Sequence, residues 1–204
     1  MAFPAFFDEV PVLRLHDGLC QLLGASDNGI LEYHYSDAVR LAGHSCPTVA
    51  GAWLMAQAGL EALYPHALPE RGELSVSLPG AEDHGVSGVI GQVLTLVTGA
   101  AAANGFHGFA GRHRRNGLLH YGADIGRASV RLQRNDTGAA VDVSYDPSSV
   151  PPSPVLPVVM EAVAQGFADA AQTQQFGELW QDRVRALLLE HAGDPAVISA
   201  QPVR

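Results

Sequence analysis

Residues 43–64, GHSCPTVAGAWLMAQAGLEALY, predict a long buried helix that organises the fold, with two metal-binding residue types at its start. Pro47 suits the first position of this helix, because the N–H that proline lacks would have no partner there. Cys46 then occupies the helix cap, and His44 lies two residues earlier, on the turn that leads into the helix. The stretch therefore predicts a helix from Pro47 to about Tyr64 with reactive side chains at its N-terminus.

These side chains suggest a metal site. A thiol at a helix N-terminus faces unpaired backbone N–H groups and the positive end of the helix dipole, and both favour the thiolate form. Thiolate and imidazole are both good zinc ligands. We therefore expect His44 and Cys46 to hold zinc or iron, with His84 or His107 from glycine-containing loops completing the site.

Other candidate residues lie near these ligands in the sequence. Glu82 and Asp83 directly precede His84, and either carboxylate could act as a general base. Arg112, Arg114 or Arg115, in the segment RHRR, could bind an acidic group of a substrate, although this segment also suits a solvated hairpin tip.

Each of these residues also has a purely structural interpretation. Cys46 could be a small buried apolar residue, and His44 could simply pack against or cap the chain. Tyr33 and Tyr35 flank a histidine in an alternating segment, so they share one face, as core residues or as the wall of a cofactor pocket. These alternatives stay open on the sequence alone.

Composition excludes several classes of function. The chain has 204 residues, 47% of them apolar and 16% charged, with a net charge of −9, which disfavours binding to nucleic acid or to an anionic membrane. All twelve cationic side chains are arginine. Without lysine there is no Walker-type phosphate loop, no lysine Schiff base and no pyridoxal phosphate linkage.

Nothing in the sequence predicts secretion or membrane insertion. Cys20 and Cys46 are too few for a disulfide framework, and residues 1–15 lack the basic start and apolar run of a signal peptide. Residues 86–103 are the most apolar stretch, but they contain Ser, Thr, Gln and Gly, so we expect a buried helix. The expected location is the cytoplasm.

The remaining elements follow from periodicity and turn signals. They predict an α+β fold with a mostly antiparallel sheet packed against several helices and a C-terminal helical arm. Apart from 47–64 and 86–103, the expected helices are 8–23, a short turn at 36–41, 158–173 and 176–191. The expected strands are 30–35, 72–78, and a hairpin of 128–134 with 139–145, joined by NDTG. In the last helix we expect a buried stripe of Trp180, Val184, Leu187 and Leu188.

The first motif resembles a known family. AGHSCPTVAGAWLMAQAGLEAL (42–63) is similar to the G-H-x-C-P-x-x-x-G-x-x-M-A signature of the FmdE-like family, which is named after a component of formylmethanofuran dehydrogenase. The matching residues are Gly43, His44, Cys46, Pro47, Gly51, Met55 and Ala56. QVLTLVTGAAAANGFHG (92–108) resembles the family's later helix, which commonly carries Cys and Asp, with another Cys after Thr-Gly. Here Gln92, Gly99 and Ala100 stand in that region.

The resemblance, which covers roughly residues 30–145, implies an α+β metal-binding domain whose His and Cys ligate the metal. Residues 1–146 would form this domain, and the proline-rich connector and helices of 147–204 would pack on it or on a partner subunit. Because the later cysteines are missing, the resemblance implies a mixed His/Cys site. Together with the arm, it also implies a homodimer.

Three functions follow as hypotheses. The first is a metalloenzyme that acts on a small molecule through zinc or iron bound by His44 and Cys46. The second is a non-catalytic metal- or haem-binding accessory protein, since Cys-Pro dipeptides can ligate haem. The third is a thiol-based redox or nucleophilic enzyme that uses Cys46, with His44 as its base.

Overall fold

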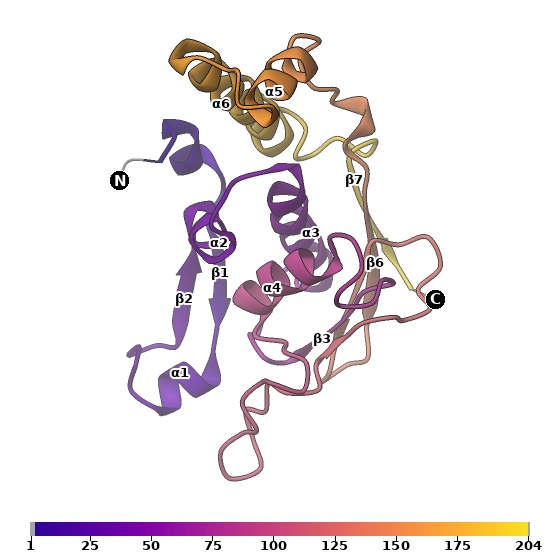
Figure 1. Ribbon diagram of the computed structural model, residues 1–204. Coiled ribbons are helices and arrows are strands. Elements are labelled where there is room, and N and C mark those ends of the chain that lie inside the picture. The colour runs from indigo at the N-terminus through magenta and orange to yellow at the C-terminus, as the bar shows by residue number, and fades with distance from the viewer. Residues whose placement is uncertain (1–2, 204) are drawn as a thin grey trace.

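The computed structural model describes residues 3–203 and confirms the α+β fold. Figure 1 shows a long central helix, α3 (Pro47–Leu63), between a two-stranded ribbon and a five-stranded sheet. The C-terminal helices lie over the end of the molecule where α3 begins. Within residues 3–203, the helices are all too short or too polar to span a membrane.

The five-stranded sheet has the order β4-β3-β5-β6-β7. Its strands are β3 (Leu74–Ser77), β4 (Leu119–His120), β5 (Val130–Arg134), β6 (Ala140–Tyr145) and β7 (Ile198–Pro202). All neighbours are antiparallel except β3 and β4, so the prediction of a mostly antiparallel sheet is confirmed. Strand β3 buries every second residue, Leu74 and Val76, as a sheet with one face on the core requires.

Helix α3 is buried along almost its whole length and packs on β6, β7 and α4. Two glycines allow this close approach. A Cβ atom at Gly51 would lie 2.2 Å from Cε1 of Tyr145, and one at Gly59 would lie 2.8 Å from Cδ1 of Leu132. The predicted helix of 47–64 is confirmed, with Cys46 as its N-cap residue.

The prediction of one helix over 8–23 is wrong. A 3-10 turn, η1 (Ala5–Glu9), is followed by strand β1 (Leu13–His16) and a short helix, α1 (Gly18–Leu22). Strand β1 pairs antiparallel with β2 (Ile30–Tyr33). The apolar residues of this segment fit a helical period, but Leu13 and Leu15 also alternate with polar residues. Pairing with β2 buries both leucines, and that tertiary contact decides the structure.

Helix α2 (Tyr35–Ala42) follows β2 directly, so the predicted strand of 30–35 ends two residues early. Helix α4 (Ser87–Thr98) is shorter than the predicted 86–103. Its last turn is closed by Gly99, whose φ of 74° is the left-handed conformation that ends many helices. The residues after Gly99 form an irregular loop that returns to β4.

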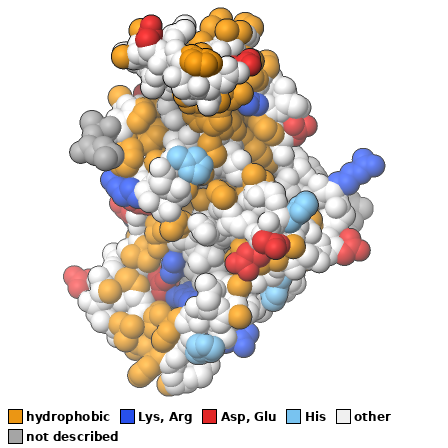
Figure 2. Space-filling view, in the orientation of Figure 1, with side chains coloured by type: hydrophobic (Ala, Val, Ile, Leu, Met, Phe, Trp, Pro, Cys, Tyr) orange, Lys and Arg blue, Asp and Glu red, His pale blue; other side chains and the backbone are white. Residues whose placement is uncertain are grey.

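The C-terminal segment packs on the same chain. It contains η2 (Pro147–Ser149), α5 (Leu156–Ala164), α6 (Ala170–Arg185) and a π-helical turn, η3 (Ala186–Glu190), so both predicted helices end earlier than expected. Val184 and Leu188 join the main core, while Leu187 is buried in a small cluster beside it. The outer side of this segment stays apolar and exposed. Val158 is 70% and Phe167 80% exposed, and Figure 2 shows hydrophobic side chains over α5 and α6.

Candidate functional site

The chain before α3 holds His44 and Cys46 in different environments. Helix α2 ends at Gly43 in the left-handed conformation, and His44 is exposed immediately after it. Its Nδ1 lies 2.9 Å from the carbonyl oxygen of Ala42, so Nδ1–H donates to that oxygen and Nε2 keeps a lone pair. The Cys46 sulfur accepts a hydrogen bond from the backbone N–H of Val49 at 3.5 Å, and Cys46 is only 8% exposed.

Ser45, between these two residues, is bound by three other side chains. Its hydroxyl lies 3.0 Å from the Tyr35 hydroxyl, and its carbonyl accepts from Trp180 Nε1 and Gln181 Nε2. Helix α6 therefore covers this turn and fixes its backbone. Tyr35 is fully buried, and burial raises its pKa well above the ordinary value, despite the hydrogen bond from Ser45. It belongs to the core beside Trp53.

The other predicted ligands lie elsewhere. His84 is exposed in the turn before α4, and His107 is exposed in the long loop, where its Nδ1 accepts from the Asn116 amide. Among residues 3–203, no three His, Cys, Asp or Glu side chains are grouped so that they could hold a metal ion. His44 and Cys46 thus supply two donors at most within one chain, fewer than a zinc site requires.

A cavity of about 300 Å³ lies beside α4. Its apolar wall is formed by Leu41, Leu96, Ala102 and Leu119. The polar residues that line it are Arg71, Glu82, Gln92, Thr95, Asn104 and Tyr121. They come from the segment before β3, the turn before α4, α4 itself, the loop after it and the end of β4. An apolar wall with a few convergent polar groups is the usual character of a small-molecule site.

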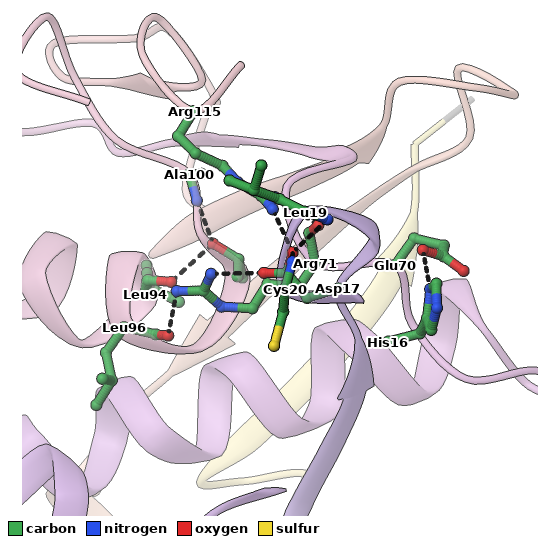
Figure 3. A network of polar contacts seen from close by, with 11 residues as sticks. His16, Asp17, Leu19, Cys20, Glu70, Arg71, Leu94, Leu96, Ala100 and Arg115 are labelled. Atoms are coloured by element: carbon green, nitrogen blue, oxygen red, sulfur yellow. Dashed lines mark hydrogen bonds and ion pairs between the residues drawn. The ribbon is translucent and has the colours of Figure 1, made fainter. Parts of the chain in front are cut away.

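The cationic side of this cavity belongs to a buried network, shown in Figure 3. The Asp17 carboxylate accepts from Arg71 Nη1 at 2.9 Å and from Arg115 Nη2 at 2.6 Å. It also caps α1 by accepting from the backbone N–H groups of Leu19 and Cys20. Arg71 reaches on to the end of α4, where Nη2 donates to the Leu96 carbonyl at 3.0 Å, and Arg115 donates to the Arg71 carbonyl.

Two guanidinium groups therefore share one carboxylate away from water. Asp17 is 3% and Arg115 7% exposed. Burial opposes ionisation of Asp17, but the hydrogen bonds from Arg71 and Cys20 and the charge of Arg115 outweigh it, so the Asp17 pKa lies below its ordinary value. Burial lowers the pKa of Arg115, and Asp17 opposes that shift. In these direct contacts two guanidinium groups share one carboxylate, so one positive charge is not balanced. That charge lies on the side where Arg71 lines the cavity.

Arg71 keeps donors for a ligand. Its two Nη atoms each make one of the hydrogen bonds above, which uses two of the five N–H groups of a guanidinium. Its Nε is buried without a hydrogen-bond partner among the described residues. Tyr33, predicted as a cofactor contact, lies beside this group, with the Arg71 guanidinium carbon 5.6 Å from its ring centroid.

The predicted arginine cluster separates into two sites. Arg112 and Arg114 are exposed and line a different, open cavity of about 510 Å³. Arg115 is buried against Asp17, so the prediction of a solvated hairpin tip is wrong at that residue. The reason is its long-range ion pair, which pulls the loop onto the body of the protein. Glu82, Asp83 and His84 are all exposed on the same turn, and of these three only Glu82 lines the cavity beside α4.

Most residues of the cavity were absent from the sequence predictions. Asp17 had a weak signal, because an acidic residue before Gly18 and a short apolar run suits a helix N-cap. Arg71 stands in a segment with no motif. Thr95 and Asn104 lie in 92–108, the segment similar to the family's later helix, but neither was singled out there, and only the fold brings the three together.

Comparison with solved structures gives a similarity of fold. No protein-family model matches the chain, and no curated protein matches it. The crystal structure of an FmdE-like protein from Syntrophus aciditrophicus, described as related to a tungsten formylmethanofuran dehydrogenase, aligns with a TM-score of 0.44 and 16% sequence identity. The alignment covers 84% of this chain and 73% of that one. The likeness is one of fold alone.

Proposed function

We propose that this protein binds a small organic carboxylate in the cavity beside α4, and that the Arg71 guanidinium binds the carboxylate group. The observation that supports this most directly is the shared carboxylate. Arg71 and Arg115 both depend on Asp17, so a second anion beside Arg71 would balance the remaining positive charge. A carboxylate also matches the planar geometry of a guanidinium.

The rest of the cavity suits a small ligand of mixed character. Its volume of about 300 Å³ lies at the lower end of ordinary ligand sites. Gln92, Thr95 and Asn104 offer amide and hydroxyl groups, while the leucines of the apolar wall would contact a short hydrocarbon portion. These features support binding of a compact metabolite-sized molecule and say nothing of its turnover.

The test is binding of simple carboxylates. We would measure binding of butyrate, pentanoate and succinate to the purified protein by saturation-transfer NMR and calorimetry. Arg71→Met should weaken binding by about 10- to 100-fold, the value of hydrogen bonds to a charged group. The matched control is Arg112→Met, which removes an exposed arginine from the other cavity and should leave binding unchanged.

Two outcomes would overturn this proposal. One is the absence of binding by any of these carboxylates at millimolar concentration. The other is equal binding by wild type and an Arg71→Met variant whose circular dichroism and unfolding midpoint show that it is folded. Thr95→Val supplies a second variant that leaves the Asp17 network intact. It should weaken binding by a smaller factor, as expected for loss of one neutral hydrogen bond.

A metal-dependent function is the second candidate, and the state of His44 favours it. Its Nδ1–H is held by the Ala42 carbonyl, so Nε2 is exposed with its lone pair free, as in many metal-binding histidines. Cys46 is the N-cap of α3, where its sulfur accepts a hydrogen bond from the Val49 N–H. These two residues would hold zinc, or alternatively iron, only if further ligands came from outside the chain and the Cys46 sulfur turned outward.

Metal content tests this second candidate. Wild type, His44→Ala and Cys46→Ser would be dialysed against zinc, freed of excess metal and analysed for bound zinc, with exposed His66→Ala as the control. Stoichiometric zinc that is lost in the first two variants and kept in the control would support the site. Equal zinc in all four proteins would exclude it, and a Soret band in the protein as purified would indicate haem instead.

A further inference from the structure

We infer that the ligand of this cavity is dipolar: a carboxylate at the Arg71 end and an ammonium group at the Glu82 end, joined by a short aliphatic chain. This inference rests on the proposed function and extends it to a substrate class, the ω-amino carboxylates. It depends on where the two charged residues of the cavity, Glu82 and Arg71, lie along the neighbouring helix α4.

Glu82 lies in the turn before α4, beside the first turn of that helix. A Cβ atom at Gly88, in the first turn of the helix, would lie 2.8 Å from the carbonyl oxygen of Glu82. One turn later, a Cβ atom at Gly91 would lie 2.1 Å from the Tyr121 hydroxyl. Tyr121 and Glu82 both line the cavity, and the pKa of Tyr121 is raised by burial and further by the charge of Glu82.

Arg71 lies at the other end of the same helix. It donates to the carbonyl of Leu96, and a Cβ atom at Gly99, the C-cap residue, would lie 3.1 Å from its Nη1. Gly91 is five residues and Gly88 eight residues before Leu96, so at about 1.5 Å per residue the part of α4 beside Glu82 and the part beside Arg71 are about 8–12 Å apart. Gln92 and Thr95 line the cavity between them.

The two charges also differ in what they already bind. Among the described residues Glu82 makes no salt bridge, and no side chain donates a hydrogen bond to it. Arg71 shares its single carboxylate partner with Arg115. A ligand with charges at both ends would satisfy both residues at once, and a plain fatty acid would leave Glu82 beside an apolar chain end.

The separation sets the length of the ligand. Allowing about 3 Å for each hydrogen-bonded contact leaves about 2–6 Å between the nitrogen and the carboxyl group. Straight chains of three to five carbons, from 3-aminopropanoate through 4-aminobutanoate to 5-aminopentanoate, cover this range. The apolar side of the cavity, formed in part by Leu41 and Leu119, would contact their methylene groups.

The experiment compares matched ligands that differ only in charge. Calorimetry or competition NMR at pH 7 would measure 5-aminopentanoate, pentanoate and pentylamine, followed by the shorter amino carboxylates. For at least one chain length, the amino carboxylate should bind about three- to fivefold more tightly than the carboxylate that lacks the amine. That factor is expected for an ion pair with an exposed carboxylate such as Glu82.

Variants at the two ends separate this inference from the proposed function. Glu82→Gln should abolish the preference for the amine without weakening pentanoate, and Arg71→Met should weaken both ligands. Asp83→Asn is the matched control, because Asp83 is exposed next to Glu82 but does not line the cavity.

If pentanoate binds as tightly as every amino carboxylate, or if Glu82→Gln keeps the preference, the dipolar ligand is excluded while the carboxylate site stands. If neither pentanoate nor any amino carboxylate binds, both proposals fail.

Discussion

Asp17 and Arg115 are 98 residues apart in the sequence, yet Arg115 Nη2 donates to Asp17 Oδ1 at 2.6 Å in a site almost closed to water. This pair ties the long loop after α4 to the end of β1. Arg71 joins it from a third segment, so one carboxylate fixes three parts of the chain. The same contacts position Arg71 at the cavity, so the network both ties the fold together and orients the residue to which we assign carboxylate binding.

Asp17→Asn should therefore lower stability strongly. The substitution keeps the shape of the side chain but leaves the buried Arg115 guanidinium and the partly buried Arg71 guanidinium without their carboxylate, a loss of about 3–5 kcal/mol. Urea unfolding followed by circular dichroism measures the change. The control is Asp136→Asn, which breaks the exposed Arg134–Asp136 pair and should cost about 1 kcal/mol or less. Equal midpoints for the two variants would contradict the role given to Asp17.

Stability should also fall as the pH rises above about 6.5, through His16 and Glu70. The hydrogen bond that His16 donates to the Glu70 carboxylate, helped by one to the Gln21 amide oxygen, raises the pKa of His16 above its ordinary value of 6.5. A histidine with a raised folded-state pKa contributes its full stability below the unfolded value and loses it as the pH rises through the folded value.

The effect should be about 0.2–1 kcal/mol, because the pair is partly exposed. Thermal unfolding would be measured at intervals between pH 6 and 8.5. Over this range the unfolding midpoint of the wild type should fall by about 1–3 °C more than that of Glu70→Gln. Glu61→Gln serves as the control, since Glu61 accepts from Gln57 and is not in contact with His16 in the described network. Identical pH profiles for wild type and Glu70→Gln would refute this assignment.

Two glycines in helices should respond to alanine in opposite directions. At Gly51 the new methyl group would overlap the Tyr145 ring, where α3 meets β6, so we expect a loss of about 1–3 kcal/mol. At Gly177, in α6, nothing lies within 4 Å of the new atom, and the better helix propensity of alanine should stabilise by up to about 1 kcal/mol. Chemical denaturation distinguishes the two, and a neutral Gly51→Ala would mean that the sheet and α3 can separate freely.

The two cysteines should differ in reactivity. Cys20 is partly exposed on α1, whereas Cys46 is buried with its sulfur held by the Val49 N–H. We expect iodoacetamide to modify Cys20 first and Cys46 only after unfolding, as peptide mass spectrometry would show. Faster modification of Cys46 in the folded protein would revive the hypothesis of a thiol-based enzyme and argue against its buried state.

The sequence was most informative where the deciding interactions are local. Pro47 at the first position of α3 and Cys46 at its cap act within one turn, so the start of this helix was predictable. The hairpin of β5 and β6 follows from alternation on either side of a four-residue turn, and its pairing is confirmed. The buried residues Val184, Leu187 and Leu188 follow from helical periodicity.

Prediction failed where distant residues decide. Leu15 fits the helical pattern of the apolar residues in 8–23, and only the pairing of its segment with β2 places it in a strand. Arg115 reads as one of several surface arginines until Asp17 is placed beside it. The cavity draws Arg71, Glu82 and Thr95 from three separate segments, and no pattern in the sequence indicates that they lie together. Their association is a property of the tertiary structure.

The hydrogen bond from Trp180 to the carbonyl of Ser45 has a consequence for how the chain is made. The two residues are 135 positions apart, so at about 5–20 residues per second a ribosome produces Trp180 roughly 7–27 s after Ser45. During that interval the N-terminal end of α3, with Cys46, has no α6 to cover it. A nascent chain therefore presents this turn to chaperones, metal ions and oxidants before the finished protein encloses it.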